Sequence, residues 1–193
     1  MANTGLLSPS NTKYEASYTP FQGSNMHDAD DSTFGQQYNL NMSGGSRTTY
    51  WYNFAGSDLP AGSTVNGVEV VFIGMYNVIG NQTQVAWDIG IGDSTESGAT
   101  GATYQSVGAQ TYSATKTTYT IGADDDLHSI DWSGFTDISD ICLKSLDIQV
   151  GSGLWITELY DVYIKVYYTP PPTPQLKLSG GKFIMSGGKF RIK

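Results

Sequence analysis

The stretch Val162-Tyr163-Ile164-Lys165-Val166-Tyr167-Tyr168 decides the fold class, because apolar and polar residues alternate along it. Such alternation predicts a half-buried strand. Its core-facing side would be Val162, Ile164, Val166 and Tyr168, and its outward side Tyr163, Lys165 and Tyr167. The same period recurs in residues 36–42, 48–54, 85–91 and 146–150, and more weakly in 116–121. Residues 68–73 are apolar on both sides, which predicts a central strand covered on two faces.

In two of these segments the period assigns the faces explicitly. Within 48–54 it places Tyr50, Tyr52 and Phe54 on one side, and Thr49, Trp51 and Asn53 on the other. Within 146–150 it turns Leu146, Ile148 and Val150 away from Asp147 and Gln149. Trp51 thus shares a side with the polar residues of its strand, and it would face outward if Tyr50, Tyr52 and Phe54 face the core.

Turn signals separate the expected strands, as in Gly44-Gly45, Pro60-Ala61-Gly62, Asn66-Gly67 and Gly151-Ser152-Gly153. Only residues 136–143 suggest a helical turn, with Asp137 or Ser139 as its cap. Seven or eight strands without long helices between them predict an all-β fold, an antiparallel β-sandwich or jelly roll. Aromatic residues make up 12% of the 193 residues, which excludes outright disorder. Charged residues make up 15%, which excludes a long coiled coil.

Charge divides the chain into two unequal parts. The net charge is −8. Five basic and 18 acidic residues before residue 171 give −13, whereas the last 23 residues hold five basic and no acidic residues and give +5. The overall balance argues against a nucleic-acid partner. We divide the chain into an extended N-terminal segment (1–24), the sandwich (25–168), a Pro-rich linker (169–175) and a basic arm (176–193).

The C-terminal arm repeats the unit Ser-Gly-Gly-Lys-Phe with a period of seven residues. The four prolines of the linker favour a stiff polyproline II spacer. Short alternating segments like those of the arm cannot bury their apolar residues alone, so we expect docking on a sheet edge of a partner subunit. The alternatives are a disordered tail and an arm that folds back on its own body. The expected docking residues are Leu176, Lys177, Leu178, Lys182, Phe183, Met185, Lys189, Phe190, Arg191 and Ile192.

Residues suited to catalysis or to a cofactor are few, and we predict neither an active site nor a cofactor. The histidines His27 and His128 stand in polar stretches, and no serine has a nucleophile-elbow pattern around it. Cys142 stands between apolar residues, which predicts a buried, inert thiol. The acidic clusters Asp28, Asp30, Asp31 and Asp124–Asp126 offer oxygen ligands of the kind that Ca²⁺ takes, but solvated loop carboxylates are the commoner case. We therefore predict no metal site and keep the first cluster as a weak candidate.

Aromatic residues could form a partner interface or a sugar-stacking platform. Trp87 fits the inner side of its strand and is expected in the core. Tyr163 and Tyr167 on the outward side of the last strand, with Trp51 if it faces outward, favour an interface with another subunit. Trp51 or Trp132, together with loop acids, would be the sugar platform of the alternative.

Four segments in order resemble a structural module of tailed bacteriophage particles. Residues 54–70 contain Pro60-Ala61-Gly62 and Asn66-Gly67 in the pattern Pro-x-Gly-x-x-apolar-x-Gly before a central strand. Residues 28–34 resemble the acidic opening of the module, 131–138 its Trp-containing loop, and 158–168 its closing strand. The stretch 90–93 and the arm depart from the pattern. The resemblance covers about residues 25–170 and implies a jelly-roll sandwich without catalytic residues, located in the virion.

Our expectation from the sequence is thus a non-enzymatic virion structural protein, a capsid decoration or cement protein or a head fibre, anchored by its arm to other virion proteins. The class also implies a homo-oligomer, with a trimer as one form. The alternative is a carbohydrate- or host-receptor-binding module of a phage tail or fibre, with a surface glycan as its partner. A third reading, a polysaccharide hydrolase domain, lacks the residues for catalysis. The N-terminus lacks the pattern of a signal peptide, and no apolar run would span a membrane, so no membrane partner is expected.

Overall fold

A computed structural model describes residues 1–15, 35–39, 46–76, 82–150, 155–172, 183–186 and 189–192. The strands are β1 (Ala2–Asn3), β2 (Pro9–Glu15), β3 (Gly35–Asn39), β4 (Ser46–Phe54), β5 (Thr64–Tyr76), β6 (Gln82–Ile91), β7 (Thr103–Thr111), β8 (Thr117–Gly122), β9 (Ile141–Val150), β10 (Trp155–Thr169), β11 (Phe183–Ser186) and β12 (Lys189–Ile192). One short helix, α1 (Glu96–Gly101), and one 3₁₀ turn, η2 (Ile138–Asp140), lie between them.

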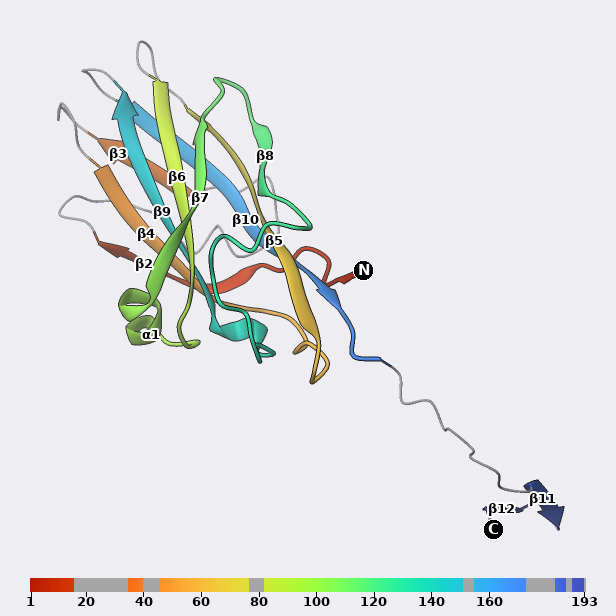
Figure 1. Cartoon of the computed structure of the whole chain (residues 1–193). Coiled ribbons are helices and arrows are strands. Elements are labelled where there is room, and N and C mark those ends of the chain that lie inside the picture. The colour runs from red at the N-terminus through yellow and green to blue at the C-terminus, as the bar shows by residue number, and fades with distance from the viewer. Residues whose placement is uncertain are drawn as a thin grey trace.

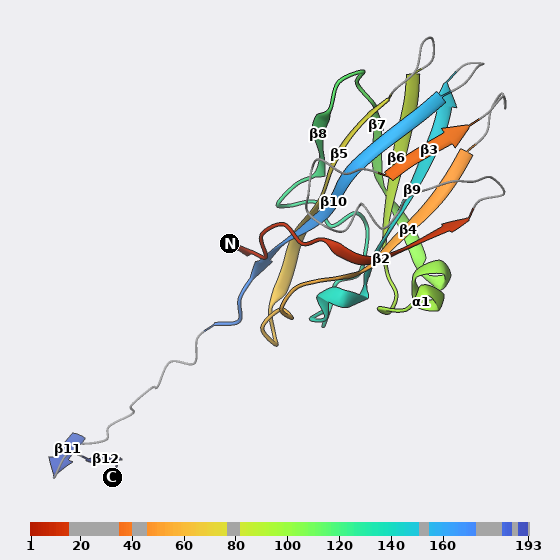
Figure 2. The same cartoon turned by 180° about the vertical axis from the view of Figure 1, so that it is seen from behind.

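Two antiparallel sheets form a sandwich, as Figures 1 and 2 show from opposite sides. Sheet I has the order β1-β10-β5-β8, and β3 also pairs with β10. Sheet II has the order β2-β4-β9-β6-β7. The predicted all-β, antiparallel sandwich is therefore confirmed. The central position expected for this strand is confirmed, because β5 pairs with β10 on one side and with β8 on the other. Its coverage on two faces is not, because Glu69 and Ile73 are only half-buried.

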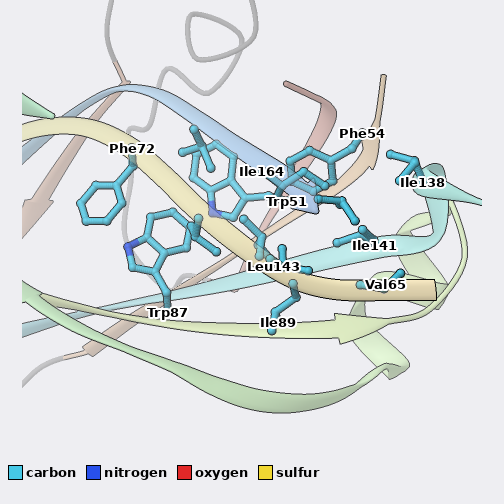
Figure 3. Close-up of a cluster of buried hydrophobic side chains, with 14 of the residues drawn as sticks. Trp51, Phe54, Val65, Phe72, Trp87, Ile89, Ile138, Ile141, Leu143 and Ile164 are labelled. Atoms are coloured by element: carbon cyan, nitrogen blue, oxygen red, sulfur yellow. The ribbon is translucent and has the colours of Figure 1, made fainter. Parts of the chain in front are cut away.

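The core lies between the sheets and is rich in aromatic rings (Figure 3). Trp87 packs on Trp51 at 6.2 Å and on Phe72 at 5.0 Å between ring centroids. All three side chains are fully buried. Around them, Leu143, Ile89, Val65 and Ile164 fill the space between the two layers. The expected core position of Trp87 is confirmed.

Trp51 does not take the outward orientation in which it would join an interface with another subunit. Its side chain is 0% exposed, and its indole Nε1 donates a hydrogen bond of 3.1 Å to the hydroxyl of Ser145. Asn53 takes a positive φ of 57°, which interrupts the alternation of β4 so that Trp51 and Phe54 both pack in the core. Tyr50 and Tyr52 are buried on the other face of sheet II, in a cluster with Ala99, Cys142 and Tyr104.

The faces predicted for the end of β9 are reversed where the structure describes them. Ser145 and Asp147 are buried at 1% and 2% exposure, whereas Leu146 is half-buried. In sheet II, Ser145 pairs with Trp87 and Asp147 with Val85, two core residues of β6. Because residues directly opposite each other share a face, these two polar residues of β9 point inward.

The predicted helical turn is only partly confirmed. Asp137 caps η2, and its Oδ1 accepts a hydrogen bond of 2.9 Å from the backbone N–H of Ser139. The chain then enters β9 at Ile141 and does not continue as a helix. Helix α1 has no counterpart in the sequence prediction. Thr95 caps it, accepting from the N–H of Gly98.

Candidate functional site

The outer face of sheet I carries the polar and aromatic residues of β10. A register shift between Leu159 and Asp161 marks a bulge. The core-facing residues are odd-numbered before the bulge and even-numbered after it. Beyond it, Val162, Ile164 and Val166 are buried in the core, whereas Tyr163, Lys165 and Tyr167 are half-buried on the outer face. The sides predicted for these six residues are therefore confirmed.

Glu69 of β5 lies directly opposite Lys165 and ties the outer face together. The hydroxyl of Tyr167 donates a hydrogen bond of 2.9 Å to Glu69 Oε1, and Lys165 Nζ lies 3.5 Å from Glu69 Oε2. The same ammonium stands 4.5 Å from the centroid of the Tyr167 ring. We call Glu69, Tyr163, Lys165 and Tyr167 the β10 face.

The electrostatics of the β10 face favour a fixed, charged arrangement. The pKa of Lys165 is raised, first by hydrogen bonding to Tyr167 and further by the charge of Glu69, against the effect of desolvation. The ammonium thus stays protonated at neutral pH, and the carboxylate of Glu69 has two donors around it. A hydroxyl-rich ligand would meet both an acceptor and a donor whose positions are already set.

A second polar group adjoins the β10 face on the other side of the bulge. The hydroxyl of Tyr160 donates to Glu158 Oε2 at 3.1 Å, and Lys116 Nζ stands 4.2 Å from the centroid of the Tyr160 ring. The pKa of Tyr160 is raised, first by burial and then by the hydrogen bond to Glu158. Glu158, Tyr160 and Asp161 are all buried, so they do not extend the solvent-exposed part of the face.

The tryptophans expected to form a sugar platform are not on the surface. Trp51 is enclosed in the core, and Trp132 is 6% exposed, with its Nε1 donating to the carbonyl of Leu127 at 3.0 Å. Trp132 also packs edge-on against Phe135 at 5.0 Å. Both residues stabilise the sandwich, and the sugar platform predicted for them is wrong.

Glu69 is the member of the β10 face that the sequence reasoning missed. It stands within the apolar run 68–73, which predicts a strand buried on both faces. A single charged residue in such a run is a signal that one face meets solvent at that point. The pairing of Glu69 with Lys165 comes from the register of β5 and β10, which the sequence does not reveal.

The loops at one end of the sandwich are acidic. Their carboxylates are Asp58, Asp93, Asp124, Asp125, Asp126, Asp131, Asp137 and Asp140, and residues 55–63, 92–95 and 123–140 contain no Lys or Arg. Burial raises the pKa of Asp140, and the charges of Asp137, Asp93 and Asp58 raise it further. Within the described residues, no group of three or more His, Cys, Asp and Glu side chains is placed to hold a metal ion. The weak metal candidates Asp28, Asp30 and Asp31 lie outside the described residues.

His128 is a structural residue of this acidic end. Its ring is buried, with Nε2 at 2.7 Å from the carbonyl oxygen of Val68 and Nδ1 at 3.1 Å from Asp126 Oδ1. Asp126 Oδ1 also accepts the backbone N–H of His128 at 2.9 Å. The histidine therefore joins the loop after β8 to the start of β5, and both ring nitrogens have partners.

Cys142 is buried, as predicted. Burial raises the pKa of its thiol to about 12, with Asp140 and Asp93 as further causes. A thiol with this pKa is a poor nucleophile at neutral pH.

The arm forms a sheet of its own, in which β11 pairs with β12. Phe183 lies opposite Ile192 and Met185 opposite Phe190, whereas Ile184 lies opposite Arg191 and Ser186 opposite Lys189. Opposed residues share a face, so one face of the ladder holds four apolar residues. Of the other expected docking residues, Leu176, Lys177, Leu178 and Lys182 lie outside the described residues. Docking itself stays a prediction.

Comparison with known proteins gives solved structures only. No family model matches the sequence, and no curated protein does. One similar structure is TmCBM61 in complex with β-1,4-galactotriose, 12% identical, covering 81% of this chain and 89% of that one, with a TM-score of 0.43. A family 11 carbohydrate-binding module from Clostridium thermocellum, in complex with a mixed-linked tetrasaccharide, is 13% identical over 86% and 95% of the two chains, with a TM-score of 0.38.

The CBM22-1 xylan-binding domain from Paenibacillus barcinonensis Xyn10C is 10% identical over 86% and 92%, with a TM-score of 0.32. At these identities and TM-scores the similarity carries no ligand over to this chain. In the part of the chain that the structure describes, no helix is long and apolar enough to cross a membrane.

Proposed function

We propose that this protein is a non-catalytic carbohydrate-binding module that holds its ligand along the β10 face. The observation that carries the proposal is the arrangement of Tyr163, Lys165 and Tyr167 on the outer side of one strand, with Glu69 fixed between two of them by hydrogen bonds. This is the alternative reading of the sequence, with a different set of residues from the tryptophans first expected to carry it.

The chemistry of the β10 face suits a sugar chain. Tyrosine rings offer an apolar surface with a polar tip, which matches the apolar and hydroxyl-bearing faces of a pyranose. Glu69 accepts hydrogen bonds from hydroxyls and Lys165 donates to them. Tyr163 and Tyr167 are four residues apart on one strand, about 13 Å at roughly 3.3 Å per residue, so the ligand would be an oligosaccharide lying along β10.

Binding without catalysis fits the groups found elsewhere in the described structure. Both ring nitrogens of His128 are engaged in the fold, and the thiol of Cys142 is buried with a raised pKa. We place the module in a phage tail or fibre, on the strength of the four segments that resemble the phage module. The virion as its location is part of the proposal.

The test is a glycan array followed by isothermal titration with the oligosaccharide that binds best. We expect Tyr163→Ala and Tyr167→Ala each to weaken binding about tenfold, since a lost ring contact is worth about 1–1.5 kcal/mol. Tyr167→Phe keeps the ring but removes the hydrogen bond to Glu69, so its loss should be smaller. Thr118→Ala, an exposed substitution on β8 of the same sheet, is the matched control and should bind as wild type.

Two outcomes would overturn the proposal. One is the absence of glycan binding by a protein whose thermal unfolding shows it to be folded. The other is binding that survives Tyr163→Ala and Tyr167→Ala together.

A structural role in the virion is a second candidate, and the arm favours it. The apolar face of the β11–β12 ladder and the basic charge of residues 171–193 suit attachment to a neighbouring acidic subunit. As a capsid decoration, cement or head-fibre protein, the chain would depend on the arm for incorporation. Deletion of residues 170–193 should then abolish incorporation into particles while the sandwich still unfolds cooperatively. Normal incorporation of the truncated chain would rule this candidate out.

A further inference from the structure

The edge of sheet I at β8 is open in the described structure. β8 pairs with β5 on one side and with no described strand on the other. Its sequence, Thr-Thr-Tyr-Thr-Ile-Gly, has no charge and no proline, the features with which proteins protect an exposed edge. The edge strand β2 of sheet II, by contrast, contains Pro9, Lys13 and Glu15.

The core is incompletely covered at the same edge. Tyr119 and Ile121 of β8 and Val107 of β7 pack against the main core but are only half-buried. The Tyr119 ring stacks on Phe72 at 5.0 Å, so it continues the aromatic core outward. Thr118 and Thr120, on the opposite side of β8, are exposed. A strand added to β8 with an apolar inner face would cover Tyr119 and Ile121.

The arm of the same chain has the complementary pattern. In β12, Phe190 and Ile192 belong to the apolar face of the ladder, and Lys189 and Arg191 to the other face. A two-stranded ladder is marginally stable in water by itself, so this face has to be covered for the ladder to persist. β12 pairs only with β11 among the described strands, which leaves one of its edges open.

One antiparallel register brings the apolar residues of the two edges together. In an antiparallel pair with Phe190 opposite Ile121, Ile192 lies opposite Tyr119 and Arg191 opposite Thr120, so apolar residues meet on the core side. Lys189 then lies opposite Gly122. It is next to the loop with the exposed residues Asp124 and Asp125, which follow β8 directly.

A Pro-rich linker separates the arm from the sandwich. Pro170, Pro171 and Pro172 follow β10 directly and Pro174 comes two residues later, which favours an extended chain. β11 and β12 form a sheet separate from the two sheets of the sandwich. In Figures 1 and 2 they lie apart from the sandwich of their own chain, which leaves them free to meet a second copy.

We infer that the arm of one copy adds β12 to the open edge of β8 in a second copy, antiparallel, with Phe190 opposite Ile121. The occupant of the β8 edge is thus the arm of another copy of this protein. The interaction uses no residue of the β10 face and does not require a glycan.

The test begins with the full-length chain in analytical ultracentrifugation. We expect a self-associating protein whose association weakens with added salt, because Lys189 lies next to the carboxylates of Asp124 and Asp125. Phe190→Ser, on the apolar face, should weaken association about tenfold or more, since a buried Phe is worth about 1.5–3 kcal/mol. Ile184→Ser is the matched control, because Ile184 lies on the other face of the ladder, and it should associate as wild type.

Disulfide trapping tests the register. A tagged copy with Thr120→Cys is mixed with an untagged copy with Arg191→Cys and oxidised, and we expect an intermolecular cross-link. Asn11→Cys, exposed on the edge strand β2, replaces Thr120→Cys in the control and should give none. The native Cys142 is buried and stays out of the reaction.

Four results would overturn the inference. The first is a monomeric full-length chain, and the second is association that survives Phe190→Ser. The third is an intrachain cross-link in a monomeric chain that carries both cysteines. The fourth is a cross-link with Asn11→Cys as strong as that with Thr120→Cys. Association that strengthens with salt would point to apolar arms packing on each other and would also refute the proposed edge.

Discussion

The substitution Gly74→Ala tests how tightly the core is packed around Tyr112. Gly74 lies in β5 opposite Leu159 and is buried. A Cβ added there would stand 2.5 Å from Cε1 of Tyr112 and 3.1 Å from the carbonyl oxygen of Glu158. Real Cβ atoms do not approach other heavy atoms to 2.5 Å, so the Tyr112 ring or the backbone would have to move.

Tyr112 has little freedom to move. The ring is 2% exposed and packs edge-on against Phe72 at 6.1 Å and Tyr119 at 5.9 Å. Overpacking at such a site costs about 1–3 kcal/mol in the free energy of unfolding. For a domain of this size, 1 kcal/mol shifts the melting temperature by about 2–4 °C, so Gly74→Ala should lower it by roughly 3–10 °C.

The assay is urea unfolding followed by tryptophan fluorescence, with thermal unfolding beside it. Gly101→Ala is the matched control, because a Cβ there meets nothing within 4 Å and the residue ends α1. It should be neutral or stabilising by about 0.5–1 kcal/mol. In a Tyr112→Ala background the cost of Gly74→Ala should largely disappear. An equal cost in both backgrounds would refute the reasoning, since the clash would then not involve the Tyr112 ring.

Three further predictions concern groups in and around the core. Ser145→Ala leaves the indole N–H of Trp51 buried without its acceptor and should cost about 1–3 kcal/mol in urea unfolding; a neutral result would contradict the hydrogen bond. Asp140→Asn should stabilise the fold by about 0.5 kcal/mol at pH 7, because a raised pKa means that folding disfavours the charged form. That gain should shrink with salt and vanish by pH 3, where the carboxyl is protonated in both states; a gain that persists there would contradict it. His128→Ala should cost about 1–3 kcal/mol in thermal unfolding, since the carbonyl of Val68 loses its donor, and unchanged stability would contradict the assigned role.

The sequence predicts the strands better than it predicts their faces. Period-two alternation is a local property, so it finds β10 and the strand β6 directly. It fails at Asn53, because a positive φ in β4 shifts the parity without any change in the hydrophobic pattern. It fails again at Ser145 and Asp147, because a polar residue can face the core when a partner such as the Trp51 indole is present.

The candidate site depends on register, which single-sequence reasoning does not provide. Tyr163 and Tyr167 could be assigned to an outer face from their spacing, but the contact of Tyr167 with Glu69 joins residues 98 positions apart. The same holds for the arm. The repeat suggests two short strands, whereas the pairing of Phe183 with Ile192 is what puts four apolar residues on one face.

The two proposed surfaces belong to one sheet, and this links their effects. The β10 face lies on the outer side of β10 and β5, and β8 is the next strand along from β5. Adding β12 of a second copy to β8 would extend that outer side, with Arg191 beside the exposed Thr120.

A glycan long enough to cross β8 would then contact both copies, so its affinity should rise with protein concentration. The affinity of a short oligosaccharide confined to the β10 face should not. Titrations at two protein concentrations, with wild type and Phe190→Ser, distinguish the cases, because the variant should lose the concentration dependence and keep the affinity for the short ligand. Loss of both would show that Phe190→Ser disturbs the β10 face itself and would contradict the independence of the two surfaces.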